Sequence, residues 1–126
     1  MPRQALQPDG MATPKPPFSP LVVSGDLVYT AGQVAHDAKG SLVAGGIEEQ
    51  TRKTLENVRT CLEAGGCTLH DVLKVNAFLS DLGDFEGYNS VYREFFAQPY
   101  PARTSVQAGL PAGILIEIEA VARRTG

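Results

Sequence analysis

The sequence lacks long apolar runs, and it has few cysteines and histidines and no excess of basic charge. Its longest apolar runs span only a few residues, as at 114–116, whereas a membrane-spanning helix needs roughly 20 apolar residues, so we expect no membrane segment. Two cysteines, two histidines and the absence of a CxxC pattern exclude a disulfide framework and a zinc-finger spacing. The formal net charge of −3 argues against a nucleic-acid partner, because phosphate binding usually needs a basic surplus.

The size and composition favour one globular domain. The chain has 126 residues, of which 43% are hydrophobic and 20% are charged, values near the averages of folded proteins. The first residues carry no apolar stretch of the kind found in secretory signals, so we expect a cytoplasmic protein. Six of the first 20 residues are proline, which removes a backbone donor and fixes φ. We therefore expect an irregular arm over residues 1–17 and one domain over residues 18–126.

Apolar periodicity predicts two helices in an α+β fold. The first helix begins after Gly46, and its apolar residues recur every three or four positions through Leu62. The second begins at the N-cap Asp84 and runs to about Ala97, and its aromatic residues are interpreted as core. Strands are predicted at 21–23, 27–31, 72–79, 102–108 and 114–123, with a weaker one at 41–44. Two helices can cover only one face of this mostly antiparallel sheet, so we expect the other face to mediate self-association.

The last two predicted strands carry an arginine and two glutamates that a hairpin would place on one face. Side chains alternate along a strand, so a register that keeps Val106 with the isoleucines in the core puts Arg103, Glu117 and Glu119 together on the opposite face. One interpretation is a solvated ion pair, which contributes only ~0–1 kcal/mol. The other is a recognition site in which the arginine fork binds a substrate carboxylate. Spacing alone favours the ion pair.

Standard catalytic and phosphate-binding motifs are absent. The sequence has no GxGxxG, GxxxxGK[ST], HExxH or GxSxG pattern. His36 and His70 are interpreted as surface or capping residues. A serine or cysteine nucleophile with a histidine base is therefore not indicated.

A set of short motifs extends over nearly the whole domain, from Phe18 to Arg124. The most informative are Tyr100–Val106, Leu110–Pro111 and Ile116–Ala120. The others are Gly25–Gln33, Gln50–Thr51 with Asn57–Val58, Phe78–Asp81 and Tyr88–Tyr92. Taken together, this set resembles the RidA (YjgF-type) family of reactive-intermediate deaminases.

The resemblance implies a chorismate-mutase-like homotrimer with clefts between its subunits. Its members hydrolyse small carboxylate-bearing imines and enamines, such as 2-iminopropanoate and 2-aminoacrylate, to a 2-keto acid and ammonia, without metal or organic cofactor. By resemblance, Arg103 binds the substrate carboxylate with help from the backbone of Ser105, and Glu117 positions a water molecule. An ordinary glutamate pKa of about 4.3 would leave Glu117 charged at neutral pH. The other cleft residues that the resemblance implies are Asn89, Ala31 and Gly32.

Some positions depart from the pattern of the best-characterised branch. Ser105 stands where a cysteine is common, and Ala31 replaces a serine. Leu21 occupies the place of an expected aromatic residue, and Phe18 is taken to supply the missing ring. Other enamines, including 2-aminomuconate and 3-aminoacrylate, therefore remain alternative substrates. Two further alternatives are a non-catalytic trimer that binds small carboxylates and an endoribonuclease, which the net charge and the absence of a histidine pair disfavour.

Overall fold

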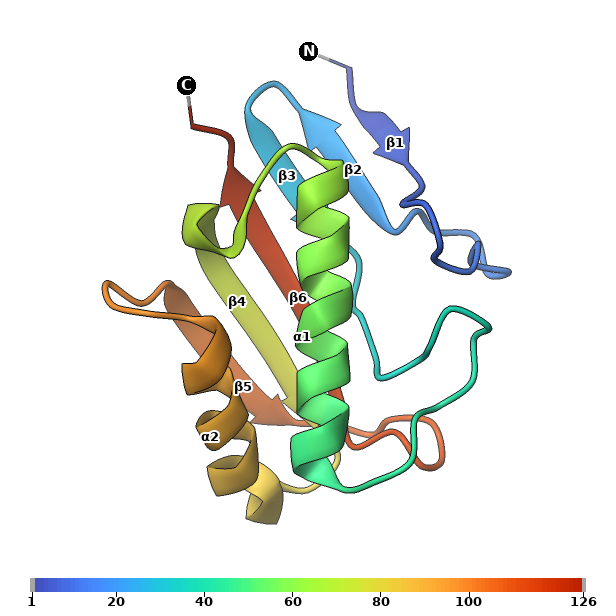
Figure 1. Ribbon diagram of the computed structural model, residues 1–126, viewed down its shortest axis with the longest axis vertical. Coiled ribbons are helices and arrows are strands. Elements are labelled where there is room, and N and C mark those ends of the chain that lie inside the picture. Colours follow the sequence, from blue (N-terminus) through green and yellow to red (C-terminus); the bar gives the residue numbers. More distant parts are fainter. Residues whose placement is uncertain (1, 126) are drawn as a thin grey trace.

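The computed structural model describes residues 2–125 and arranges them in two layers, a sheet and a pair of helices (Figure 1). The strands are β1 (Gln4–Leu6), β2 (Leu21–Ser24), β3 (Leu27–Thr30), β4 (Val72–Leu79), β5 (Ala102–Gln107) and β6 (Ile116–Arg123). The helices are α1 (Ile47–Ala64) and α2 (Phe85–Phe95), with two short 3-10 turns, η1 (Leu69–Asp71) and η2 (Leu82–Asp84). The strands form one sheet in the order β1-β2-β3-β6-β4-β5.

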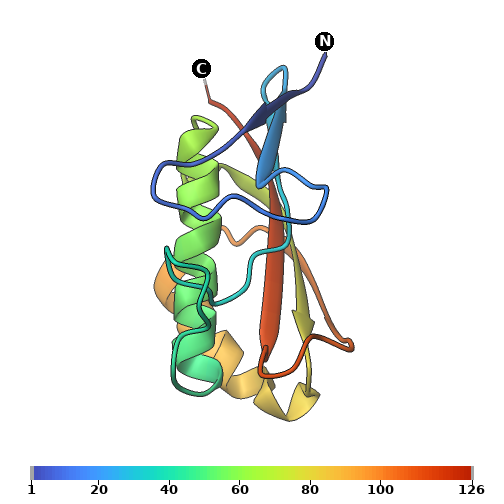
Figure 2. The same cartoon turned by 90° about the vertical axis from the view of Figure 1, so that its right-hand side faces the viewer.

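Both helices lie on the same side of the sheet (Figure 2). We call the side without helices in the described chain the open face. Neighbouring strands are antiparallel except β4 and β5, which run parallel and are joined by the crossover through α2. This architecture confirms the predicted α+β class. No helix between residues 2 and 125 is both long and apolar enough to span a bilayer.

The sequence of α1 explains both of its ends and its buried stripe. The backbone N–H of Gly46 donates to the carboxylate of Glu49 at 2.7 Å, and Glu48 adds negative charge at the positive end of the helix. Gly66 follows the last turn with a φ of 86°, a conformation that favours glycine. The buried side chains are Gln50, Thr51, Thr54, Leu55, Val58, Cys61 and Leu62. The prediction of this helix is confirmed.

The pairing of β4 with β6 decides which side chains form the core. Ala77 pairs with Ile118 and Leu79 with Ile116, and all four are almost fully buried on the helix side. These side chains belong to the apolar core between the two layers, and their burial favours this register. The alternate residues of the two strands point to the open face, namely Lys74, Asn76, Phe78, Glu117 and Glu119.

The predicted hairpin of the last two strands is wrong, because β4 lies between β5 and β6. β6 is paired on both sides, with β3 and with β4. In this central place its alternate residues are buried from Ile116 to Ala122. β5 is an edge strand instead, and α2 returns the chain to the free side of β4. Local order in the sequence favoured a hairpin, whereas burial of the apolar strand β6 favours the centre of the sheet.

Two smaller expectations also differ from the structure. Residues 41–44 form no strand, and one isolated bridge joins Leu42 to His36. The arm is not wholly irregular, since β1 adds an edge strand to β2. An edge position suits a segment flanked by prolines, because only one side of the strand needs backbone donors. The division of the chain at residue 18 stays a prediction.

Candidate functional site

Arg103 lies on β5 and points toward α2, on the helix side of the sheet. In the parallel register it lies beside Val75, which is fully buried. The guanidinium carbon is 4.7 Å from the ring centre of Tyr92, 5.0 Å from that of Tyr88 and 5.7 Å from that of Phe85. Cation–π contacts and the apolar stem of arginine allow a charged residue to sit among these rings.

Two polar contacts join β5 to α2 around the arginine. Nη1 of Arg103 donates to Oδ1 of Asn89 at 2.8 Å. Two residues further along β5, the hydroxyl of Ser105 and that of Tyr88 form a hydrogen bond of 2.9 Å. Burial raises the pKa of Tyr88 above its usual value, so its hydroxyl stays protonated at neutral pH. α2 therefore holds both Arg103 and Ser105 in fixed positions.

A pocket of about 250 Å³ lies beside Arg103. We call it the arginine pocket, and its walls are Asn89, Tyr92, Arg93, Tyr100, Pro101 and Arg103. None of these residues is acidic, and no carboxylate in residues 2–125 forms an ion pair with Arg103. A half-buried guanidinium that is fixed and lacks an acidic neighbour is a suitable receptor for a small carboxylate. In the sequence, Tyr92 is interpreted as core, since aromatic residues on the apolar face of a helix are usually core, and Tyr100 occurs there only within a motif and has no expected role.

Glu117 lies on β6 and points to the open face, beside Phe78 of β4. Gly32 is so close that a Cβ at this position would overlap the glutamate carboxylate. Burial raises the pKa of Glu117, and the negative charge of Glu119 raises it further. The expectation of an ordinary pKa is therefore wrong, because the sequence does not report this burial. A raised pKa makes the ionised carboxylate a better proton acceptor than an exposed glutamate.

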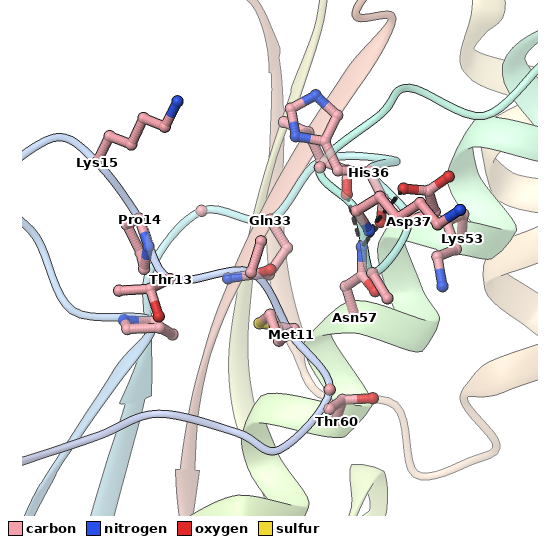
Figure 3. Close-up of a pocket in the computed structure, with 18 of the residues that line it drawn as sticks. Met11, Thr13, Pro14, Lys15, Gln33, His36, Asp37, Lys53, Asn57 and Thr60 are labelled. Carbon is pink, nitrogen blue, oxygen red and sulfur yellow. Dashed lines mark hydrogen bonds between the residues drawn. The ribbon is translucent and has the colours of Figure 1, made fainter.

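A larger pocket of about 820 Å³ contains Glu117 and is shown in part in Figure 3. We call it the glutamate pocket. Gly32 and Phe18 line it, together with residues 9–16 of the arm. Figure 3 shows the arm on one side of this pocket and α1 on the other. The sulfur of Met11 lies 3.9 Å from that of Cys61 on α1, so the arm contacts the helix directly.

Asn57 on α1 fixes the loop that follows Gly32. Its Nδ2 donates to the backbone carbonyls of Val34 and His36, both at 2.9 Å, as the dashed lines in Figure 3 show. Two backbone acceptors bound by one amide hold the loop in one conformation. In the sequence, Asn57 stood out only as part of a motif, and no role was predicted for its side chain. Its role depends on a loop 21 to 23 residues earlier in the chain.

Two residues that we expected to contact substrate lie outside both pockets. Leu21 is 1% exposed and belongs to the core, because it begins β2 on the helix side. This corrects its assignment, and Phe18, which is 51% exposed, lines the glutamate pocket instead. Ala31 lines neither pocket, and its N–H donates to the carbonyl of Pro20 at 2.8 Å. Of this turn, Gly32 and Gln33 line the glutamate pocket instead.

The expectation that Arg103 and Glu117 share one face of the sheet is wrong. Arg103 lies on the helix side with Ile118, whereas Glu117 points to the open face and lines a different pocket. The prediction placed Val106 in the core, but this residue is 41% exposed. The rings of α2 cover Arg103 instead, so the buried face of β5 is the one with the charged residue.

The two histidines lie in different parts of the fold. His36 is in the loop that lines the glutamate pocket, and His70 is exposed in η1. Among residues 2–125, no group of three histidine, cysteine, aspartate or glutamate side chains is placed to hold a metal ion.

The fold and the two pockets define an α+β domain with an arginine on one side of its sheet and a partly buried glutamate on the other. A family model described as Endoribonuclease L-PSP matches residues 10–124. The chain therefore belongs to this family, the YjgF/RidA family, and the resemblance seen in the sequence is confirmed.

Individual relatives are similar over most of the chain. A RutC family protein of Pyrococcus horikoshii is 46% identical over 113 residues, which cover 86% of this chain and 90% of that protein. Human 2-iminobutanoate/2-iminopropanoate deaminase is 40% identical over 108 residues, or 84% of this chain and 79% of the human protein. The crystal structure of E. coli TdcF with bound serine has a TM-score of 0.89 at 34% identity and covers 97% of this chain and 99% of that one.

Proposed function

We propose that this protein hydrolyses small carboxylate-bearing imines and enamines, of the 2-iminopropanoate and 2-aminoacrylate type, to a 2-keto acid and ammonia. The observation that carries the proposal is Arg103, which is fixed by Asn89 and aromatic rings in a pocket without acidic residues. The human relative is named for a reaction of this type. The E. coli relative was solved with serine, whose small carboxylate suits the same kind of receptor.

In the proposed reaction Arg103 binds the substrate carboxylate, assisted by the backbone N–H of Ser105. A water oxygen attacks the imine carbon while Glu117 accepts one of its protons. The new C–O bond forms as the C=N π bond breaks, and the carboxyl group of Glu117 returns the proton to nitrogen, which gives a carbinolamine with OH and NH2 on one carbon. The carboxylate of Glu117 then transfers the hydroxyl proton to nitrogen while the C–N bond breaks and the C=O bond forms, so that ammonia and the 2-keto acid leave. One water is consumed, and nothing is oxidised or reduced. Imines already react with water, so positioning and one base suffice.

Arg103 and Glu117 act on one substrate only if two copies of the chain meet. The two residues lie on opposite sides of the sheet in a single chain. The open face exposes Tyr29 and Val106, at 45% and 41%, which favours burial against another protein surface. We expect the homotrimer of the family to bring the arginine pocket of one copy to Glu117 of the next. Light scattering should give three times the 13.4 kDa of one chain, and an active monomer would contradict this arrangement.

A coupled assay tests the deaminase. An L-amino-acid oxidase releases 2-imino acids, semicarbazide traps them as semicarbazones, and the absorbance of the semicarbazone falls when the protein competes for the imine. We expect the wild type to suppress this signal and Arg103→Ala to leave it high. Arg123→Ala is the matched control, because Arg123 is an exposed residue whose one ion pair among residues 2–125 is with Asp26. Suppression by Arg103→Ala equal to that of the wild type would contradict the role of this arginine.

The family description favours a second candidate, an endoribonuclease. The net charge of −3 and the separate positions of His36 and His70 give this candidate little physical support. Titration of a labelled RNA at several salt concentrations distinguishes the two. Binding that weakens steeply with salt, accompanied by cleavage, would support the ribonuclease, and we expect neither. A wild type that binds 2-keto acids but suppresses no semicarbazone would instead support the non-catalytic carboxylate-binding trimer.

A further inference from the structure

The arginine pocket contains a second arginine that the proposed reaction does not use. Arg93 lines this pocket together with Arg103. It lies in the last turn of α2, four residues after Asn89, the residue that accepts a hydrogen bond from Arg103. Residues four apart on a helix share a face, with their Cβ atoms about 5–6 Å apart. The side chain of Arg93, an exposed residue, therefore starts one helical turn from the residue that fixes the first guanidinium, and it reaches the wall of the same pocket.

Neither arginine of the pocket is neutralised within the described chain. The ion pairs among residues 2–125 use other basic residues, namely Arg52, Lys53 and Arg123. The pocket walls include no acidic residue, although the chain as a whole has a net charge of −3. Two like charges that face one small space repel each other, and an anion between them removes the repulsion. A ligand with two negative groups would satisfy both arginines.

The remaining walls suit a short hydrocarbon chain between two charged ends. Tyr92 is 5% exposed and packs its ring against Arg103. Tyr100, which is 49% exposed, and Pro101 come from the segment that leads into β5. Aromatic rings and proline pack favourably against the hydrocarbon part of a ligand, and the guanidinium groups set the orientation of its charged ends.

We infer that the arginine pocket selects imines and enamines that carry a second carboxylate. Arg103 binds the carboxylate next to the imine, and Arg93 binds the one at the far end of a four- or five-carbon chain. This inference rests on the proposed function and names its substrate class. Arg93 is then a specificity-determining residue, and its loss weakens the binding of dicarboxylates without changing that of monocarboxylates.

Two stable 2-keto acids test this assignment as product probes. 2-Oxoglutarate and 2-oxopentanoate have the same chain length and differ in the distal carboxylate. Calorimetric titration of the full-length protein should show 2-oxoglutarate binding roughly fivefold more tightly, since one partly exposed ion pair is added. The preference should shrink as salt is raised. Arg93→Gln should abolish it while keeping the affinity for 2-oxopentanoate, and Arg93→Lys should retain part of it.

Arg59→Gln is the matched control, because Arg59 is an exposed arginine of α1 outside the pocket. This variant should keep the wild-type preference. Equal affinities for both acids in the wild type, or a preference that survives Arg93→Gln, would overturn the inference. The semicarbazone assay with the imine of a monocarboxylate runs in parallel. Hydrolysis of that imine without a dicarboxylate preference refutes only the role of Arg93, whereas no hydrolysis and no binding of either acid refutes the proposed function as well.

Discussion

The two sides of the sheet hold their key charged residue in different ways. On the helix side, α2 surrounds Arg103 with three aromatic rings and the amide of Asn89. On the open face, Glu117 lies against Gly32 and near Glu119, in a pocket that the arm helps to form. The arginine site is thus built from α2, whereas the pocket that contains Glu117 is formed by the arm, by the loop after Gly32 and by α1. In the proposed reaction, carboxylate binding by Arg103 and proton transfer by Glu117 can therefore be altered independently.

Removal of the arginine should have the largest effect on catalysis. Arg103→Ala deletes one or two charge-assisted hydrogen bonds to the substrate carboxylate, so kcat/KM should fall about 100-fold to 10,000-fold. Arg103→Lys keeps the charge but loses the planar fork, so its activity should lie between that of Arg103→Ala and that of the wild type. Steady-state kinetics with 2-iminopropanoate measure both variants, and circular dichroism checks that they fold. Equal activity of Arg103→Ala and the wild type would refute the role of Arg103 in binding the substrate carboxylate.

Removal of the glutamate should affect the chemical step rather than binding. Glu117→Gln keeps the shape of the side chain and loses the proton acceptor, so kcat should fall by roughly 100-fold. KM should change little, because Arg103 still binds the carboxylate. A rise in KM at constant kcat would show instead that Glu117 contributes to binding.

A methyl group at Gly32 should disturb the glutamate without removing it. The Cβ of Gly32→Ala would overlap the carboxylate of Glu117 and displace it. Misplacement of a reacting group by about 1 Å lowers rates by up to 100-fold, so we expect kcat to fall about tenfold or more. Gly109→Ala is the control, because a Cβ there meets open space. Kinetics of the two variants side by side give the answer, and equal kcat values would mean that the position of Glu117 is unimportant.

The raised pKa of Glu117 predicts that this residue lowers the stability of the folded protein at neutral pH, although the proposed reaction needs it. The folded state binds this proton more tightly than the unfolded state, so the contribution of Glu117 to stability falls as pH rises from its unfolded pKa through its folded pKa. Glu117→Gln removes this loss. Its melting temperature should exceed that of the wild type at pH 7, and the two should converge near pH 4. Thermal melts across this range test the sign, and a less stable variant at pH 7 would contradict it.

Loss of the hydrogen bond between the hydroxyls of Ser105 and Tyr88 should have the smallest effect on activity. Ser105→Ala leaves the buried hydroxyl of Tyr88 unpaired and should cost about 1–3 kcal/mol of stability. Tyr88→Phe leaves the hydroxyl of Ser105, which is only half-buried, and should cost about 1 kcal/mol or less. Urea unfolding of both single variants and the double variant measures the coupling. Additive losses would show that the hydrogen bond contributes nothing.

Residues close together in the sequence predicted the helices and most of the strands. Contacts between residues far apart in the sequence decided the order of the strands and the position of the site residues, which the sequence did not predict. The ends of α1 follow from Gly46, the first-turn glutamates and Gly66, which lie within the helix or next to it. The order of the strands depends on β4 entering between β5 and β6, and no nearby residue signals this. The positions of Phe18 and Leu21 differ for the same reason, since strand pairing decides which residue enters the core.

The amino-acid sequence by itself determined the helices, most strands, the α+β class and the motifs that place the chain in its family. These features depend on residues that are close along the chain. Only the tertiary structure decided that Arg103 faces α2 and Glu117 the open face. A side chain takes its side of a sheet from the neighbours that bury it, and here these neighbours are the rings of α2, which no alternation pattern within β5 reports.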